Sequence, residues 1–230
     1  MVNRCKDAKT QRCREVKKQK VKLLNFSALQ PFTFSAKGGS MGKLEGTKTQ
    51  QCLINAFAGE SQARNRYTYF ASVAKKEGFE QISAIFLETA DNEKEHAKLF
   101  YKHLGSGSAK VEAVYPFHLG NTIENLRHAA AGEHEEWTSL YLDAAEIATE
   151  EGFTDIANTF KQVLEVEKHH EQRYLTLVSN IESDLVFKKQ TDVQWKCRNC
   201  GRVYFGIQAP LVCPTCFHPQ AYFELLGDNF

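Results

Sequence analysis

Proline, methionine and long apolar runs are scarce in this chain. Its 230 residues include 5 Pro and 2 Met. No stretch approaches the roughly 18 consecutive apolar residues that a bilayer-spanning helix needs. The mean hydropathy of −0.44 agrees, so we expect no membrane partner. With 42% hydrophobic and 25% charged residues, the composition excludes collagen, coiled-coil rods and disordered chains, and predicts an ordinary globular protein.

Net charge is nearly absent at +1, but it is unevenly distributed. Residues 1–40 hold ten Lys and Arg against two Asp and Glu, whereas 41–230 hold 19 against 26, a net −7. The head lacks the apolar core of a secretory signal. Three interpretations stay open for it: an organellar presequence, a disordered basic tail, or an upstream extension of the reading frame before Met41. It lacks the interleaved aromatics of a nucleic-acid-stacking surface, so we expect no nucleic-acid partner.

A secreted disulfide framework is also absent, because the seven cysteines are odd in number and unevenly placed. Four of them form two C-x-x-C pairs within 20 residues: Cys197, Cys200, Cys213 and Cys216. Each pair forms a knuckle that presents two sulfurs, so the spacing predicts a tetrahedral thiolate metal site and a reducing compartment. We expect Cys52 to be a buried structural thiol, and assign no role to Cys5 or Cys13.

Apolar residues recur at helical spacing from about 47 to 182. Breaks at Gly78 and Gly152 and a long connection over 105–118 predict helices at 47–76, 79–104, 120–150 and 153–182, as two hairpins joined by a crossover. A linker is expected over 184–194. From Trp195 the pattern changes to short β-prone pieces, too few for a core of their own without metal. We therefore predict a mainly α protein, with a four-helix bundle over 41–183 and a small β/knuckle metal domain over 195–230.

The two hairpins resemble each other. Ala-Gly-Glu at 58–60 recurs 73 residues later at 131–133, and Glu-Gly-Phe at 77–79 recurs 74 later at 151–153. The motif Glu93-x-x-His96 also recurs 74 later as Glu167-x-x-His170. One inserted residue explains the change of offset. Two copies are too few for a solenoid, so the repeat indicates an internally duplicated bundle.

The repeat also predicts a metal site. Residues three apart share a helical face, so each Glu-x-x-His aims a carboxylate and an imidazole in one direction. A single such motif is weak support, but Glu60 and Glu133 occupy matching places on the other two helices. One Glu from each of two helices plus Glu-x-x-His from the other two is a di-iron or di-manganese arrangement.

Glu136 adds a fifth carboxylate on the same face, and five buried negative charges require cations. Exchange of Glu136 for the neutral His96 would leave −4 against two divalent ions, which suggests a redox-linked switch. Other acidic and histidine residues point elsewhere and are expected to be solvated or packed: Glu95, Glu135, Glu165, His103, His118, His128, His134, His169 and His218. For the four cysteines, spacing alone favours zinc. A neighbouring redox site favours a one-electron Fe(Cys)4 centre.

Several segments together resemble the rubrerythrin family across about 41–230: AFAGESQARNRY (56–67), ETADNEKEHAK (88–98), AAGEHEEW (130–137), EVEKHHEQRY (165–174) and the four-cysteine tail (195–226). The tail departs from free-standing rubredoxins at Phe217, where a Gly is usual. The resemblance implies a ferritin-like di-iron bundle, a rubredoxin-like domain, and a peroxidase that reduces hydrogen peroxide to water.

By the same resemblance, Glu93 and Glu167 bridge two irons, Glu60 and Glu133 are terminal ligands, and His170 binds one iron. Glu136 and His96 alternate on the other iron. Tyr67 and Tyr141 match family tyrosines that could hydrogen-bond to ligands or peroxide, although either could equally be a packed aromatic.

The resemblance further implies a head-to-tail homodimer and an external donor, a rubredoxin or an NAD(P)H-dependent reductase; the chain has no G-x-G-x-x-G motif of its own. Family habit places it in the cytoplasm, and an organelle is the alternative if 1–40 is a presequence. Two rival functions remain: a ferritin-like ferroxidase that stores iron, and a non-enzymatic metal-binding sensor with a zinc ribbon.

Overall fold

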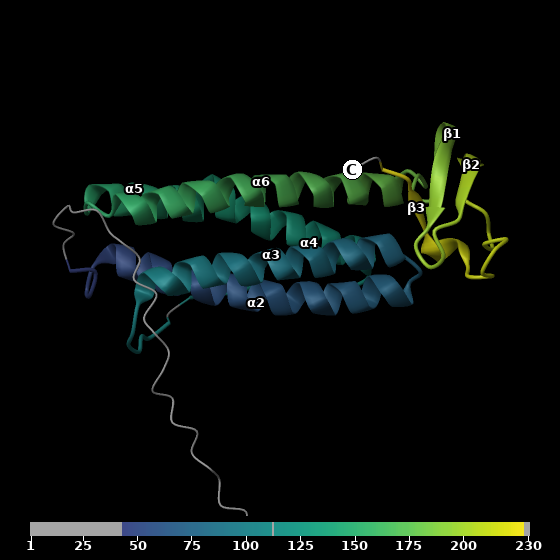
Figure 1. Cartoon of the computed structure of the whole chain (residues 1–230). Coiled ribbons are helices and arrows are strands. Elements are labelled where there is room, and N and C mark those ends of the chain that lie inside the picture. The colour runs from purple at the N-terminus through teal and green to yellow at the C-terminus, as the bar shows by residue number, and fades with distance from the viewer. Residues whose placement is uncertain (1–42, 112, 228–230) are drawn as a thin grey trace, which may run out of the picture. The chain divides into compact units, whose positions relative to one another are not determined.

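A computed structural model describes residues 43–111 and 113–227; the basic extension expected over 1–40 lies outside them. Four helical rods run side by side (Figure 1), and their bounds agree with the predicted ones within two residues. No helix in the described ranges is long and apolar enough to cross a membrane. The helical segments are α2 (Lys48–Lys76), α3 (Glu80–Leu104), α4 (Thr122–Glu135), η1 (Glu136–Leu140), α5 (Tyr141–Glu150) and α6 (Thr154–Glu182).

The helix predicted over 120–150 is right in extent but is not regular. Between α4 and α5, η1 is a π-helix, in which the N–H of Tyr141 donates to the carbonyl oxygen of Glu136. A π-turn holds one more residue than an α-turn. The repeat offset changes from 73 at Glu133 to 74 at Glu151, and η1 lies in that interval. The inserted residue therefore widens the helix instead of lengthening a loop.

The two halves of the repeat cap each other. The carboxylate of Glu151, after α5, accepts hydrogen bonds from the backbone N–H groups of Lys48 and Thr49, at 3.2 and 2.8 Å, and from the Thr49 hydroxyl at 2.6 Å. Its repeat partner Glu77, after α2, accepts from the N–H of Thr122 at 2.9 Å. Each carboxylate satisfies free donors at the positive end of the other half's first helix.

A layer of buried charge divides the apolar core of the bundle in two. On α3, Phe86 belongs to one apolar cluster and Phe100 to the other, and Glu93 and His96 lie between them. The same order holds along α2 and α6. The hydrophobic clusters therefore fix the helices above and below the layer and hold its charged side chains at one level.

The C-terminal segment forms a three-stranded antiparallel sheet in the order β2-β1-β3. Its strands are β1 (Lys188–Cys197), β2 (Val203–Gln208) and β3 (Phe223–Leu225). The predicted linker over 184–194 is wrong beyond 187, because Lys188 already pairs with Gln208. A register shift between Lys188 and Val193 interrupts the alternation, which is why this polar stretch reads as a linker.

Two glycine substitutions should change stability in opposite directions. Gly152 has a φ of +84°, so Gly152→Ala should lower the free energy of unfolding by about 1–2 kcal/mol. Gly59 lies inside α2, and a methyl group there would meet only the Tyr115 ring at 3.9 Å. Gly59→Ala should therefore raise stability by about 0.5–1 kcal/mol. Urea unfolding followed by circular dichroism tests both; a Gly152→Ala protein as stable as the parent would contradict the turn's role.

Candidate metal centres

Six of the predicted ligands meet in the charged layer, and each is buried. They form two groups whose ligand atoms lie within 4.8 Å of one another: Glu60, Glu93, His96 and Glu167; and Glu93, Glu133, Glu167 and His170. Glu93 and Glu167 belong to both groups. The arrangement is that of two adjacent cation sites that share two carboxylates.

Both histidines face the shared carboxylates. His96 Nδ1 lies 2.9 Å from Glu93 Oε2 and 2.9 Å from Glu167 Oε1. His170 Nδ1 lies 2.9 Å from Glu167 Oε2 and 3.3 Å from Glu93 Oε1. The two imidazole rings are 6.0 Å apart, with an interplanar angle of 28°. Each shared carboxylate thus turns one oxygen to each histidine, as a bridge between two ions requires.

The donor atoms of the layer fit bound cations. Leaving a buried polar atom without a partner costs about 1–3 kcal/mol, and more for a charged group. Coordination of two cations would satisfy all six layer atoms that lack a hydrogen-bond partner: Glu60 Oε2, Glu93 Oε1, Glu133 Oε2, Glu167 Oε1, Glu167 Oε2 and His170 Nδ1.

Two buried tyrosines orient the remaining carboxylates. The Tyr67 hydroxyl donates to Glu133 Oε1 and the Tyr141 hydroxyl to Glu60 Oε1, each at 2.6 Å. Burial raises the pKa of both tyrosines well above the usual range, so both remain protonated donors. Each terminal carboxylate therefore has one oxygen fixed and one free to bind a cation. Both roles left open by the sequence are therefore present, because each tyrosine donates to a carboxylate and its ring packs in an apolar cluster.

Charge coupling in the layer is strong when no cation is bound. Burial lowers the pKa of His96, but Glu167 and Glu93 outweigh it and raise that pKa to about 10. Burial also lowers the pKa of His170. The neighbouring Glu133, Glu167 and Glu93 outweigh this effect and raise that pKa to about 12. Burial and the charge of Glu93 raise the pKa of Glu133 to about 8. Protons thus take the place of cations in the metal-free layer.

Glu136 is the exception among the predicted ligands. It is half-buried at the start of η1, and its carboxylate belongs to neither group of ligand atoms. Burial, followed by the charge of Glu133, raises its pKa well above the usual range. The equivalent residue of the first half, 73 positions earlier, is Ala63. Glu136 therefore breaks the internal symmetry of the site.

The other acidic residues and histidines lie outside the layer. Glu95, Glu135 and Glu165 are exposed, as predicted, and so are His128, His134 and His169. One further contact was not predictable from any motif: Asn92 Oδ1 lies 3.3 Å from His170 Nε2. This amide can orient the imidazole whose Nδ1 faces the carboxylates.

The four cysteines also converge. Their sulfurs lie within 4.8 Å of one another, with Cys197 and Cys216 3.7 Å apart and Cys200 and Cys213 3.7 Å apart. Tetrahedral coordination with bonds of about 2.3 Å requires sulfur separations of about 3.8 Å. The sulfurs therefore fit one tetrahedral ion. A backbone N–H from His218 lowers the pKa of Cys216 to about 6, which favours its thiolate.

The residue after each knuckle has a left-handed backbone conformation. Gly201 has a φ of +75° and Phe217 a φ of +62°. Phe217, the departure noted in the sequence, therefore keeps the knuckle geometry that Gly permits more easily. Cys52, expected to be buried, is only partly so and packs against the bundle core.

We expect the metal-free bundle to lose stability as the pH rises from about 4.5 towards 10. The folded-state pKa values of Glu133, His96 and His170 are raised, so the folded chain holds more protons than the unfolded one. The Glu133 contribution is complete below its ordinary value of 4.5 and is lost as the pH rises through about 8. That of His96 is lost through about 10. Melting temperatures of chelator-treated protein test this; a flat or rising profile would contradict it.

Comparison with known proteins covers both regions. The rubrerythrin family matches residues 51–178, and the rubredoxin-like domain of rubrerythrin matches 195–224. The chain is 54% identical over 188 residues to rubrerythrin of Porphyromonas gingivalis, covering 81% of this chain and 94% of that protein. Identity to rubrerythrin of Nitratidesulfovibrio vulgaris is 49% over 191 residues, with coverages of 83% and 100%. A structure of fully reduced, all-ferrous nigerythrin has a TM-score of 0.52 at 28% identity, covering 86% of this chain and 98% of that one.

Proposed function

The chain belongs to the rubrerythrin family, and on that premise we propose that it is a peroxidase that reduces hydrogen peroxide to water. One observation carries the proposal: a buried carboxylate and histidine layer that fits two cations and a four-thiolate site that fits one occur in the same chain. A storage protein needs only the first, whereas a peroxidase that receives electrons singly uses both.

In this proposal both centres hold iron. Glu93 and Glu167, which belong to both groups, would be the shared ligands, Glu60 and Glu133 would be terminal ligands, and His170 would bind one iron. Iron bound there would supply the two electrons that, with two protons, reduce hydrogen peroxide to two waters. The apolar clusters on either side of the layer keep bulk water from the reacting atoms. Tyr67 and Tyr141 keep the terminal carboxylates in place, because each fixes one oxygen.

Glu136 and His96 are proposed to alternate on the other iron. The charge of Glu136 contributes to the raised pKa of Glu60, in the group that contains His96, and the charge of Glu133, in the other group, contributes to the raised pKa of Glu136. Glu136 therefore lies beside the layer and interacts with carboxylates of both groups. His96 is also the most exposed of the six layer residues, at 7%. The His96 side chain therefore lies on the part of the layer that is closest to solvent.

Electrons are proposed to come from outside the chain, through an NAD(P)H-dependent reductase or a rubredoxin, and to reach the pair through the Fe(Cys)4 centre. His170 lies 12 residues before the end of α6, about 18 Å along the helix axis, and the cysteines follow that end. A homodimer packed head to tail would bring the four-thiolate site of one copy closer to the layer of the other.

Metal counting with peroxide titration tests the proposal. Protein reduced and purified without oxygen should contain three irons per chain, and the ferric-thiolate colour should return as peroxide is added in stoichiometric steps. Two irons with one zinc, and no such colour, would favour the sensor. Retention of many irons per chain would favour the ferroxidase.

A cysteine variant separates the two centres. Cys213→Ser should remove the tail iron, because one of four thiolates is lost, and reduce the iron count from three to two. One turnover of the reduced layer with peroxide should persist, while reductase-linked turnover should fall about tenfold or more. Cys52→Ser is the matched control, since Cys52 is outside the four-thiolate group. Unchanged reductase-linked turnover in Cys213→Ser would contradict the relay.

A further inference from the structure

One carboxylate outside the ligand set ties the π-helix to α6. Glu171 Oε2 accepts a hydrogen bond from the Trp137 indole N–H, and Glu171 Oε1 lies 3.0 Å from His134 Nδ1. Trp137 directly follows Glu136. The Lys168 ammonium group lies over the Trp137 ring, 5.6 Å from its centroid. The Glu171 side chain is 16% exposed and its bond to Trp137 is partly buried, so this bond is stronger than it would be in water. The contact with His134, whose side chain is 56% exposed, lies nearer to solvent.

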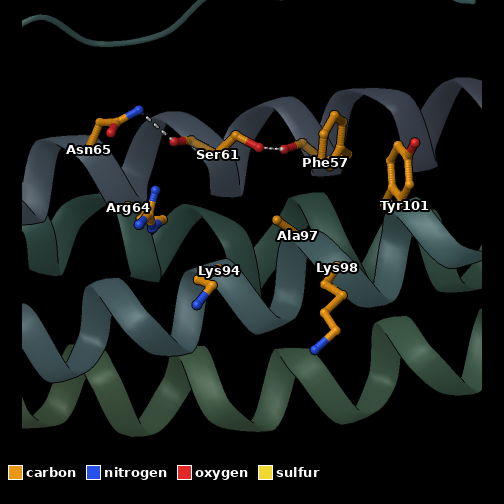
Figure 2. Close-up of a pocket in the computed structure, with 8 residues that line it drawn as sticks. All are labelled: Phe57, Ser61, Arg64, Asn65, Lys94, Ala97, Lys98 and Tyr101. Carbon is orange, nitrogen blue, oxygen red and sulfur yellow. Dashed lines mark hydrogen bonds between the residues drawn. The ribbon is translucent and has the colours of Figure 1, made fainter. Parts of the chain in front are cut away.

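The first half of the repeat lacks the three hydrogen-bonding residues of this arrangement, although Lys94 matches Lys168. At the equivalent positions, Arg64 replaces Trp137, Ser61 replaces His134, and Ala97 replaces Glu171. These three residues instead line an open pocket of about 410 Å³ between α2 and α3 (Figure 2). The first half also has a regular α-helix where η1 lies in the second. The π-helix, the extra carboxylate and the Trp137–Glu171 bond therefore occur together in one half.

The direction of the Glu136 carboxylate depends on η1. The charge of Arg66 acts on this carboxylate, but no hydrogen bond from another described residue fixes it. Its direction therefore follows from the backbone of the π-helix, whose geometry is rare and needs support from its surroundings. Glu171 provides that support through its hydrogen bond to Trp137, the residue after Glu136.

We propose that Glu171 is a positioning residue for Glu136: by binding Trp137 and His134 it fixes η1 against α6 and so sets where Glu136 meets the metal pair. The inference rests on the proposed function for its kinetic consequence, but not for its structural one. In this role Glu171 contacts neither metal nor peroxide.

The structural part is tested without metal. In metal-free Glu171→Ala, backbone amides of η1 should exchange with deuterium about tenfold faster than in the parent, because the bonds that hold the π-helix are gone. Trp137→Phe keeps an aromatic ring but removes the donor and should act in the same direction. Glu171→Gln keeps an acceptor for the indole and should restore slow exchange in part. Glu165→Ala removes an exposed carboxylate of the same helix and should change nothing.

The kinetic part uses the iron-loaded chain. Glu171→Ala should retain three irons, yet reoxidation by peroxide in one turnover should slow about 10-fold to 100-fold, since small misplacements of reacting groups have effects of that size. In a Glu136→Ala background the same substitution should change the rate about twofold or less. The proposal would be overturned if Glu171→Ala slowed reoxidation as much in the Glu136→Ala background as in the parent. It would also be overturned if the η1 amides of Glu171→Ala exchanged no faster than those of Glu165→Ala. A chain that binds iron but does not react with peroxide would refute the proposed function and leave the exchange result valid.

Discussion

The mutual repulsion of buried carboxylates is the constraint on which the rest of this structure depends. Four buried glutamates share one layer with two histidines, and no arrangement of that layer is stable without positive charge. Protons supply it in the metal-free chain, through the raised pKa values of His96 and His170. Two apolar clusters flank the layer and hold the helices where cations can replace those protons.

The fold and most of the site follow from the repeat. Because Glu93 and His96 recur at a fixed offset on α6, their convergence with Glu60 and Glu133 is predictable from helical geometry alone. The bonds that orient them are less accessible to sequence reasoning: Tyr67 donates to the opposite half, and Asn92 carries no motif. The change of offset predicts an inserted residue, but only the structure shows that this residue forms part of a π-helix. The start of strand β1 was not predicted, because its first residues are polar and pair irregularly with β2.

The site combines a symmetric frame with an asymmetric addition. Both halves supply the same ligands, and Tyr67 and Tyr141 exchange equivalent bonds across them. Glu136, η1 and the Glu171 contacts exist in one half only. Symmetry gives two similar cation positions, whereas the addition brings a further carboxylate to the layer from the second half alone.

The caps provided by Glu77 and Glu151 have a consequence for the symmetry of the bundle. Each hairpin alone would leave the donors at the start of its first helix unsatisfied, because the carboxylate that binds them comes from the other hairpin. Two identical hairpins could exchange these contacts about a two-fold axis, as isologous dimers do. Both ends of the bundle therefore have, within one chain, the reciprocal contacts of an isologous interface.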